Sequence, residues 1–145
     1  AAPVSGKAIP MGQVSDPTFS QEILGKGTAV IPSDGRVVAP ADGLVTMVFD
    51  TKHAISMQTD NGAELIIHIG LDTVQLKGQY FEAHVAAGDK VKQGDLLLDF
   101  EIDKIKEAGY DVTTPVIICN TPQFPKMECR NGMEVKAGET AIIKL

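Results

Sequence analysis

The sequence has no tryptophan, and aromatic residues make up only 5% of its 145 residues. Surfaces on which bases or sugars could stack would therefore be sparse, which disfavours a lectin or a single-strand nucleic-acid binder. Basic residues are also outnumbered, because 13 lysines and arginines face 19 aspartates and glutamates for a formal net charge of −6. No basic stripe offsets this charge, so the sequence argues against binding to nucleic acid or to an anionic membrane surface.

Cysteines and long apolar runs are scarce as well. The two cysteines, Cys119 and Cys129, lack the Cys-x-x-Cys spacing of redox or zinc chemistry. They could pair with each other, but without a signal peptide we expect both to be reduced residues of the core. The apolar runs, such as Leu65–Ile67 and Leu96–Leu98, are far shorter than a membrane-spanning helix. The chain also does not open with a basic and apolar leader. We therefore expect a domain that is soluble and not secreted.

What is present is the composition of one ordinary globular domain. With 145 residues, 43% of them hydrophobic, the chain can bury an apolar core without metals or disulfides. We therefore predict a single domain over residues 1–145. The first residues, Ala1–Gly6, are small and turn-forming, which fits either a linker to a longer chain or an ordinary frayed terminus.

Short strand-like runs separated by Asp-Gly and Asn-Gly turns dominate the sequence. We predict an all-β fold with strands over residues 28–31, 36–39, 44–49, 54–59, 64–69, 96–100, 112–119 and 140–145. Helices should be few and short. One is predicted to be capped and started by Asp16-Pro17 and to end near Gly25, and another is predicted to be capped by Asp103 and to end near Gly109.

A faint internal repeat is visible in two turn segments. Val91–Asp95 reads Val-Lys-Gln-Gly-Asp and Val135–Glu139 reads Val-Lys-Ala-Gly-Glu, and each precedes an apolar run. Duplication of a strand-and-turn unit would build an antiparallel β-sandwich with two related halves. The alternative is that this motif is only a common way to turn into a strand, and the residues alone leave both open.

Two of the three histidines, His53 and His68, bracket the clearest predicted hairpin. Its turn lies within residues 60–62, and a turn of even length puts both imidazoles on one face of the sheet. If the first two turn residues form the loop, the histidines oppose each other, and if the last two form it, they are diagonal neighbours. Either arrangement, with side chains starting about 5 to 8 Å apart, lets two rings share one small ligand. A turn of odd length would break this pairing.

The alternation of side chains along a strand predicts the neighbours of the two histidines. The residues expected on the histidine face are Ile66, Ile55, Thr51 and Phe49. The residues expected on the core face are Leu65, Ile67 and Ile69. Apolar surface around two imidazoles often marks a docking site, and Thr51 lies close enough to orient the His53 ring. The alternative is that both are hydrogen-bonded core histidines without a chemical role.

Several kinds of catalytic site lack support in the residues. Two imidazoles are too few for a zinc site, and no spacing demands that Cys119, His84 or Asp72 complete one. Neither a Gly-x-Ser-x-Gly motif nor a glycine-rich phosphate loop before a helix is present. The remaining option is that one histidine attacks a phosphoryl group and the other stabilises it. A neutral imidazole forms a labile N–P bond, which suits a relay between proteins.

Six segments of the sequence are familiar when taken together: Thr51–Ser56, Gly62–Val74, Val38–Gly43, Leu76–Gly78, Val91–Asp95 and Thr114–Asn120. They are similar to the glucose-type IIA component of the bacterial phosphoenolpyruvate-dependent sugar phosphotransferase system. The resemblance covers nearly the whole chain. It implies an antiparallel β-sandwich of duplicated half-units, the duplicated hybrid motif, with short helices. It also implies a phosphotransferase component without cofactor or metal, which takes a phosphoryl group from the small protein HPr and passes it to a IIB domain of a sugar permease.

The resemblance also implies a role for individual residues. His68 would be phosphorylated on Nε2, and the carbonyl of Gly70 would accept the proton on His68 Nδ1. His53 would donate to the phosphoryl oxygens, and Thr51 would orient His53. The residues that would meet the partners are Phe49, Ile66, Ile23 and Leu24, with Asp72 and Asp16 on the rim.

Some residues depart from the family pattern. Gln75 stands where relatives often carry an acid, and Thr18 stands among usually apolar positions, which leaves the partner contacts open. His84 is expected at the surface without a role. The resemblance implies a cytoplasmic location, at the inner face of the cell membrane if the domain belongs to a fused permease, and residues 1–6 would then be the linker remnant.

Two other classes share parts of the expected architecture. A biotinyl or lipoyl carrier domain needs a lysine in a tight hairpin, usually next to methionine, and only Lys126 beside Met127 comes near this pattern. A zinc endopeptidase of this architecture needs a His-x-His pair, where this chain has His68 followed by Ile69 and Gly70. Both remain as alternatives to the phosphoryl relay.

Overall fold

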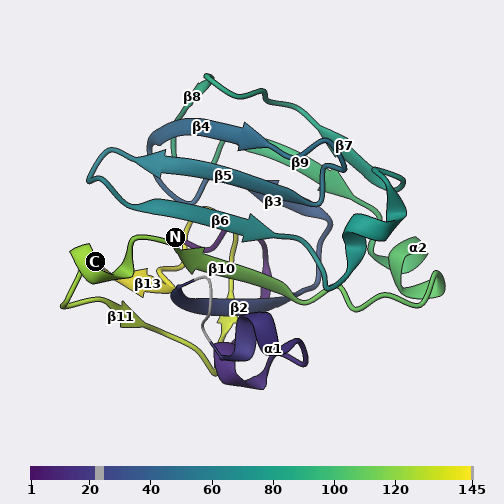
Figure 1. The fold of residues 1–145 in the computed structure, drawn as a ribbon, viewed down its shortest axis with the longest axis horizontal. Helices are drawn as coiled ribbons and strands as arrows, with labels where there is room; N and C mark the ends of the chain where they lie inside the picture. The colour runs from purple at the N-terminus through teal and green to yellow at the C-terminus, as the bar shows by residue number, and fades with distance from the viewer. Residues whose placement is uncertain (22–24, 145) are drawn as a thin grey trace.

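The computed structural model of the chain describes residues 1–21 and 25–144 and has two main antiparallel sheets that form a β-sandwich (Figure 1). In the described residues, the larger sheet has the order β12 (Glu134–Val135), β1 (Gly6–Pro10), β2 (Lys26–Pro32), β10 (Thr114–Ile118), β6 (Glu64–His68), β5 (Ala54–Thr59), β4 (Gly43–Val48) and β8 (Lys90–Val91). The smaller sheet has the order β3 (Arg36–Val38), β9 (Leu96–Phe100) and β7 (Phe81–Ala83). A minor pair joins β11 (Glu128–Cys129) to β13 (Ile143–Lys144). Cys129 and Cys119 are both exposed, so the prediction that they are core residues was wrong.

The order of the larger sheet reads as two equivalent halves that meet between β10 and β6. Gly6 at the start of β1 pairs with Val135 of β12, and Gly43 at the start of β4 pairs with Val91 of β8. In both halves the glycine is needed because a Cβ there would lie only 2.0 or 2.3 Å from a carbonyl oxygen of the next strand. The predicted duplication of a strand-and-turn unit is therefore visible in the register of the strands.

The two repeated turns that follow β8 and β12 lie against each other. Gln93 Nε2 donates to the carbonyl of Gly138 at 2.9 Å, and a Cβ on Gly138 would lie 3.2 Å from Gly94 Cα. Because β8 and β12 are the two ends of the larger sheet, this contact brings its ends together, and Val91 and Val135 join one hydrophobic core.

The first residues of the chain also belong to this core. Ala2 and Val4 are fully buried, and the Ala2 N–H donates to the carbonyl of Thr140 at 2.7 Å. The Val38 N–H donates in turn to the carbonyl of Pro3 at 2.7 Å. Residues 1–6 thus hold packing positions in this fold, and their further role as a linker remnant stays a prediction.

The helices are shorter than the sequence suggested. The first, α1 (Pro17–Ser20), follows the 3-10 turn η1 (Met11–Gln13), and residues 22–24 of the predicted span lie outside the described residues. The second, α2 (Ile102–Glu107), has Glu101 at its N-cap position, so Asp103 lies in its first turn and is not the cap that the sequence predicted. Two more 3-10 turns are η2 (Thr73–Leu76) and η3 (Thr121–Gln123).

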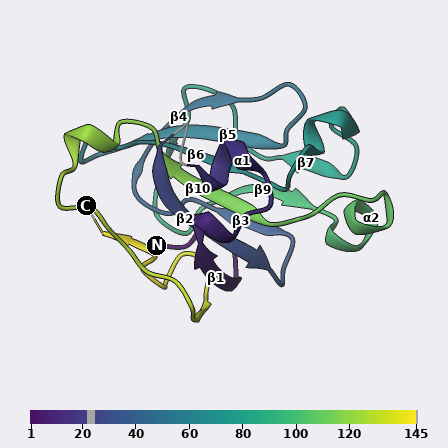
Figure 2. The same cartoon turned by 60° about the horizontal axis from the view of Figure 1, so that its bottom comes forward.

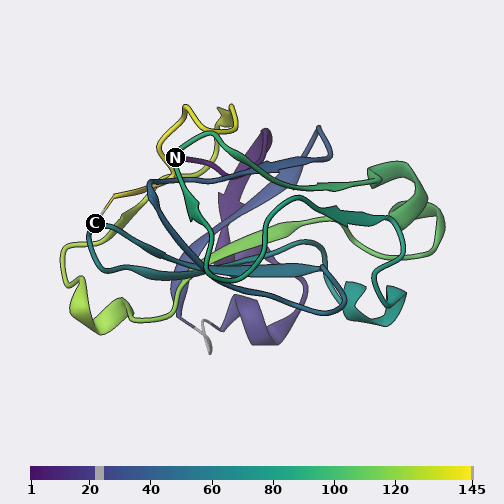
Figure 3. The same cartoon turned by 90° about the horizontal axis from the view of Figure 1, so that it is seen from above.

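The α1 segment covers part of the outer face of the larger sheet, as Figures 2 and 3 show from two sides. Phe19 of α1 and Met11 of η1 pack against Ala29 of β2 and Ile117 of β10 in a second, smaller hydrophobic cluster. The remainder of that outer face, over β6, β5 and β4, is not covered by this cluster. Within residues 1–21 and 25–144, the structure contains no helix that is long and apolar enough to cross a membrane.

Candidate functional site

His68 ends strand β6 and is half-buried, with one ring nitrogen held by the backbone. Its Nδ1 lies 2.7 Å from the carbonyl oxygen of Gly70. A carbonyl only accepts hydrogen bonds, so Nδ1 carries the proton and donates it. The lone pair of the neutral ring is then on Nε2, which is the nitrogen available for bond formation.

The Gly70 carbonyl is itself fixed by its surroundings. Gly70 has φ +80°, and a Cβ at this position would lie 2.5 Å from Thr73 Cγ2 and 2.8 Å from the carbonyl oxygen of Asp111. The next residue, Leu71, donates its N–H to that Asp111 carbonyl at 2.9 Å, and the Thr73 hydroxyl donates to the carbonyl of Ile69 at 2.5 Å. Only glycine fits here without strain, so the sequence Gly-Leu-Asp-Thr after β6 sets the direction of the His68 ring.

The hairpin that carries the histidines has a turn of odd length, which is the case in which the sequence analysis expected the pairing of the two histidines to break. Gln58 pairs with Glu64, and the Thr59 N–H donates to the carbonyl of Ala63 at 2.9 Å, which leaves a three-residue loop at 60–62. Gly62 has φ +91°, as three-residue loops ending in a left-handed residue require. With this register, His68 pairs with Ala54, and not with His53 or Ile55 as a turn of even length would require.

The two rings meet nevertheless, because His53 lies outside the strand. Lys52 has φ +58° and donates its N–H to the carbonyl of Phe49 at 2.7 Å, so a tight turn precedes β5 and the alternation of faces begins only at Ala54. The carbonyl of His53 accepts the N–H of Ile69 at 2.7 Å, which fixes His53 beside the end of β6. The ring centroids of His53 and His68 are 4.9 Å apart and their planes are inclined by 78°.

The odd turn also reassigns Ile55, which was expected on the histidine face. Ile55 pairs with Ile67, and both side chains are fully buried in the main core together with Leu65. The outer row of this hairpin consists instead of the pairs Ala54 with His68 and Ser56 with Ile66. The core assignment of Leu65, Ile67 and Ile69 is confirmed.

Each imidazole has its own partner on Nδ1 and its own aromatic neighbour. The Thr51 hydroxyl is hydrogen-bonded to His53 Nδ1, the contact that the family resemblance implied. The Phe49 ring stands edge-on to His53 at 5.5 Å between centroids. Phe19 of α1 contacts His68 at 4.9 Å between centroids, and sequence reasoning missed it. Its presence in the predicted helix, three residues after Asp16, was the signal that could have found it.

Burial keeps both histidines neutral. The pKa of His53 is lowered to about 4, mainly because its ring is removed from water and also because of the charge on His68. The pKa of His68 is also lowered, because burial outweighs the other effects on this ring. The hydrogen bond to Gly70 and the carboxylates of Asp16 and Asp72 raise the pKa in part. Two neutral rings side by side are able to receive an anionic group without first losing a proton.

The surface around the two rings is apolar with acidic residues nearby. Ile66 is half-buried on the strand that carries His68, and Met47 on β4 is exposed to 51%. Met47, Ser56, Ile66 and Ile117 form one row across β4, β5, β6 and β10. Of the predicted docking residues, Phe49 and Ile66 thus lie at the site, whereas Ile23 and Leu24 lie outside the described residues.

The chain matches the model of a protein family described as phosphoenolpyruvate-dependent sugar phosphotransferase system, EIIA 1, over residues 1–124. The chain belongs to this family. The match decides between the three classes that the sequence left open, in favour of the phosphotransferase system and against the biotinyl or lipoyl carrier and the zinc endopeptidase.

The relatives of this EIIA domain include free-standing and fused proteins. It is 46% identical over 144 residues to a glucose-specific EIIA component of Halalkalibacterium halodurans, covering 99% of this chain and 83% of that protein. It is 52% identical over 123 residues to a beta-glucoside-specific EIIBCA component of Bacillus subtilis, covering 85% of this chain but only 20% of that protein. The solved structure of glucose permease IIA from Mycoplasma capricolum aligns with a TM-score of 0.88 and 35% identity, over 98% of this chain and 92% of that one. This EIIA domain is therefore a component of a sugar phosphotransferase system with the β-sandwich fold.

We predict that the ring of His53 titrates near pH 4 in a nuclear magnetic resonance titration of the histidine rings. Replacing His68 with Gln should raise the pKa of His53, since one of the two causes of its lowering is removed, but burial should keep this pKa below 6.5.

The low pKa of His53 also predicts how the stability of the unaltered protein depends on pH. Between about pH 6.5 and pH 4 the unfolded chain binds a proton on His53 that the folded protein does not bind, so the free energy of unfolding should fall as the pH drops through this range. A His53 that titrates at or above 6.5 in the unaltered protein would contradict this picture.

Proposed function

We propose that this EIIA domain accepts a phosphoryl group from phospho-HPr on Nε2 of His68 and passes it to a IIB domain during sugar uptake. The observation that carries the proposal is the pair of neutral imidazoles at 4.9 Å, each with its Nδ1 already hydrogen-bonded. The family match supports the phosphotransferase system as the setting, and the fused EIIBCA relatives support a permease as a partner.

The two hydrogen bonds on Nδ1 favour opposite tautomers. His68 donates from Nδ1 to Gly70, so its Nε2 has a lone pair for attack on phosphorus. If the Thr51 hydroxyl donates to Nδ1 of His53, the proton of the neutral His53 ring is on Nε2 and can be donated to a phosphoryl oxygen. One ring is then the nucleophile, and the other stabilises the transferred group.

The transfer exchanges one N–P bond for another. The lone pair of His68 Nε2 attacks phosphorus, the bond to the donor's nitrogen breaks, and that nitrogen keeps the electron pair. The carbonyl of Gly70 and the carboxylates of Asp16 and Asp72 stabilise the positive charge that the His68 ring acquires. Transfer to the IIB domain reverses these roles, with phosphohistidine as the donor and no water consumed.

The surface around the rings supplies a place for both partners. Phe49, Ile66 and Met47 offer an apolar contact area, and Asp16 and Asp72 offer negative charge beside His68. We propose that HPr and the IIB domain place basic residues against these acids, which aligns the donor or acceptor atom with His68. Ile23 and Leu24 lie outside the described residues, and on the strength of the family resemblance they are proposed to take part as well.

We also propose a cytoplasmic location for this domain, at the inner face of the cell membrane when it acts in a permease. The proposed partners, HPr and a IIB domain, would both have to reach His68 from the same compartment. The linker role of residues 1–6 is part of this proposal.

Incubation with phosphoenolpyruvate, enzyme I and HPr should label this domain with one phosphate that is acid-labile and alkali-stable. His68→Ala should abolish the label, because no other nitrogen occupies the same place. His84→Gln is the matched control, since it removes an imidazole on the other sheet, and it should be labelled normally. Labelling that survives His68→Ala would show that a different residue is the nucleophile.

His53→Gln should still be labelled by phospho-HPr but should pass the group to a IIB domain about 10²-fold more slowly, as the loss of one donor to a developing charge predicts. Single-turnover transfer from the isolated phosphoprotein measures this step directly. Thr51→Val should show a weaker defect of the same kind, because the His53 ring remains but loses its orientation. Equal transfer rates for the unaltered protein and His53→Gln would remove His53 from the mechanism.

A further inference from the structure

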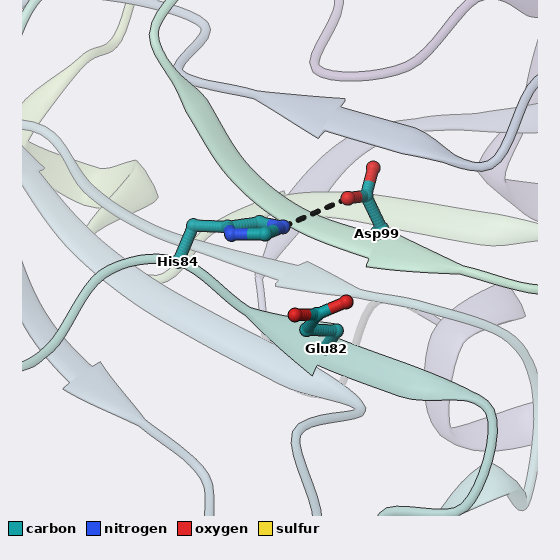
Figure 4. Close-up of side chains that lie close together, drawn as sticks. All are labelled: Glu82, His84 and Asp99. Atoms are coloured by element: carbon teal, nitrogen blue, oxygen red, sulfur yellow. Dashed lines mark hydrogen bonds and ion pairs between the residues drawn. The ribbon is translucent and has the colours of Figure 1, made fainter.

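The third histidine, His84, lies beside two carboxylates on the smaller sheet, as Figure 4 shows. Glu82 on β7 pairs directly with Asp99 on β9, so both side chains are on the same face. His84 is two residues after Glu82 and its N–H donates to the carbonyl of Leu97, which continues the ladder and the same alternation. One ligand atom from each of the three residues lies within 4.8 Å of the other two.

We propose that Glu82, His84 and Asp99 bind one divalent transition-metal ion of the Zn²⁺ type. Three protein ligands, one imidazole nitrogen and two carboxylate oxygens, are the number that an open zinc site uses, with water or another group in the fourth position. The imidazole favours zinc and its neighbours in the transition series over Mg²⁺ and Ca²⁺, which prefer oxygen ligands throughout.

The distances suit such an ion after small side-chain rotations. Ligand atoms around a tetrahedral Zn²⁺ are separated by about 3.4 Å, given bonds of about 2.0 to 2.1 Å. His84 Nε2 and Asp99 Oδ2 are now 2.7 Å apart, joined by a hydrogen bond that a metal would replace. The backbone positions need not move, because β7 and β9 are already paired at these residues.

The charges also favour a cation. Two carboxylates directly opposite each other on a sheet repel, and a divalent ion between them would relieve this repulsion. The cation that opposes this effect is Arg36, which pairs with Asp99 from the other side and therefore shares its face. Side chains of His84 and Asp99 are 34% and 41% exposed, so the ion can enter from solvent.

The metal site is separate from the phosphoryl site and does not rest on the proposed function. His68 ends β6 of the larger sheet and His53 directly precedes β5 of the same sheet. Glu82 and Asp99 lie on β7 and β9 of the smaller sheet, and His84 directly follows β7. A protein with His53→Gln and His68→Gln therefore keeps the proposed metal ligands and cannot bind metal through the other two imidazoles. This double variant is the background in which the proposal is tested.

In this background, chelator-treated protein should bind one equivalent of Zn²⁺ in isothermal titration calorimetry. Adding His84→Gln or Glu82→Gln should weaken the affinity more than about tenfold, since even partners that only support a ligand cost that much. Glu107→Gln, which removes one exposed carboxylate on α2, is the matched control and should leave the affinity unchanged. Arg36→Gln should strengthen binding, because it removes the opposing positive charge.

Co²⁺ provides a second readout, since ligand-field absorption reports nitrogen and oxygen ligands directly. The absorption should appear in the double variant and disappear with His84→Gln, while thermal unfolding without metal stays the same in both proteins. Saturable Zn²⁺ binding that is equally strong with His84→Gln would overturn the proposal, and so would the absence of saturable binding in the double variant.

Discussion

The site depends on a hydrogen bond from an imidazole Nδ1 to a backbone carbonyl that is held in place. In His68 this bond to Gly70 fixes both the tautomer and the direction of the ring. The carbonyl faces the ring because Gly70 has positive φ, and no side chain fits at this position because a Cβ would lie within 3 Å of Thr73 and of the Asp111 carbonyl. The Asp111 carbonyl and the Thr73 hydroxyl support the same segment, so part of the site's geometry comes from the loop before β10.

The fold supplies the second constraint, which is the placement of His53 at the end of β6. The larger sheet consists of two equivalent halves that meet at β10 and β6, so the histidine hairpin lies near the centre of the sheet and not at its ends. The Ile69 N–H and the His53 carbonyl join the end of β6 to the turn before β5. On the outer face, α1 brings Phe19 against His68, while Phe49 stands against His53. Burial by these neighbours keeps the rings neutral.

The strands were predictable where apolar residues recur with a clear period. The eight predicted strands all exist, because runs such as residues 54–59 and 64–69 alternate or are continuously apolar between turn residues. Strand β1 was missed because Gly6 at its start was assigned to a possible linker segment. Strands β7, β8, β11 and β12 were missed because they have only two or three residues each, too few for a period to appear.

The proximity of the histidines was predicted, but the reason given for it was wrong. We had assumed that His53 follows the alternation of faces along β5. In the structure, Lys52 has a left-handed conformation in a tight turn before β5, so the alternation begins only at Ala54 and does not include His53. The sequence could not predict this conformation, because it is the tight turn at residues 49–53 that requires a positive φ at Lys52, and lysine itself does not favour one. Ile55 was misplaced because the turn at 60–62 has three residues, which puts Ile55 on the core face. Asp111 reaches the site from a distant segment, and only tertiary packing reveals such a contact.

The most direct test of the account is the protonation of the two neutral rings, measured by long-range nitrogen–proton correlation spectra of the histidine side chains near neutral pH. The account predicts that His68 carries its proton on Nδ1 and His53 carries its proton on Nε2. Finding the His68 proton on Nε2, or the same tautomer in both rings, would contradict it, because the nucleophile and the donor would then no longer be distinct.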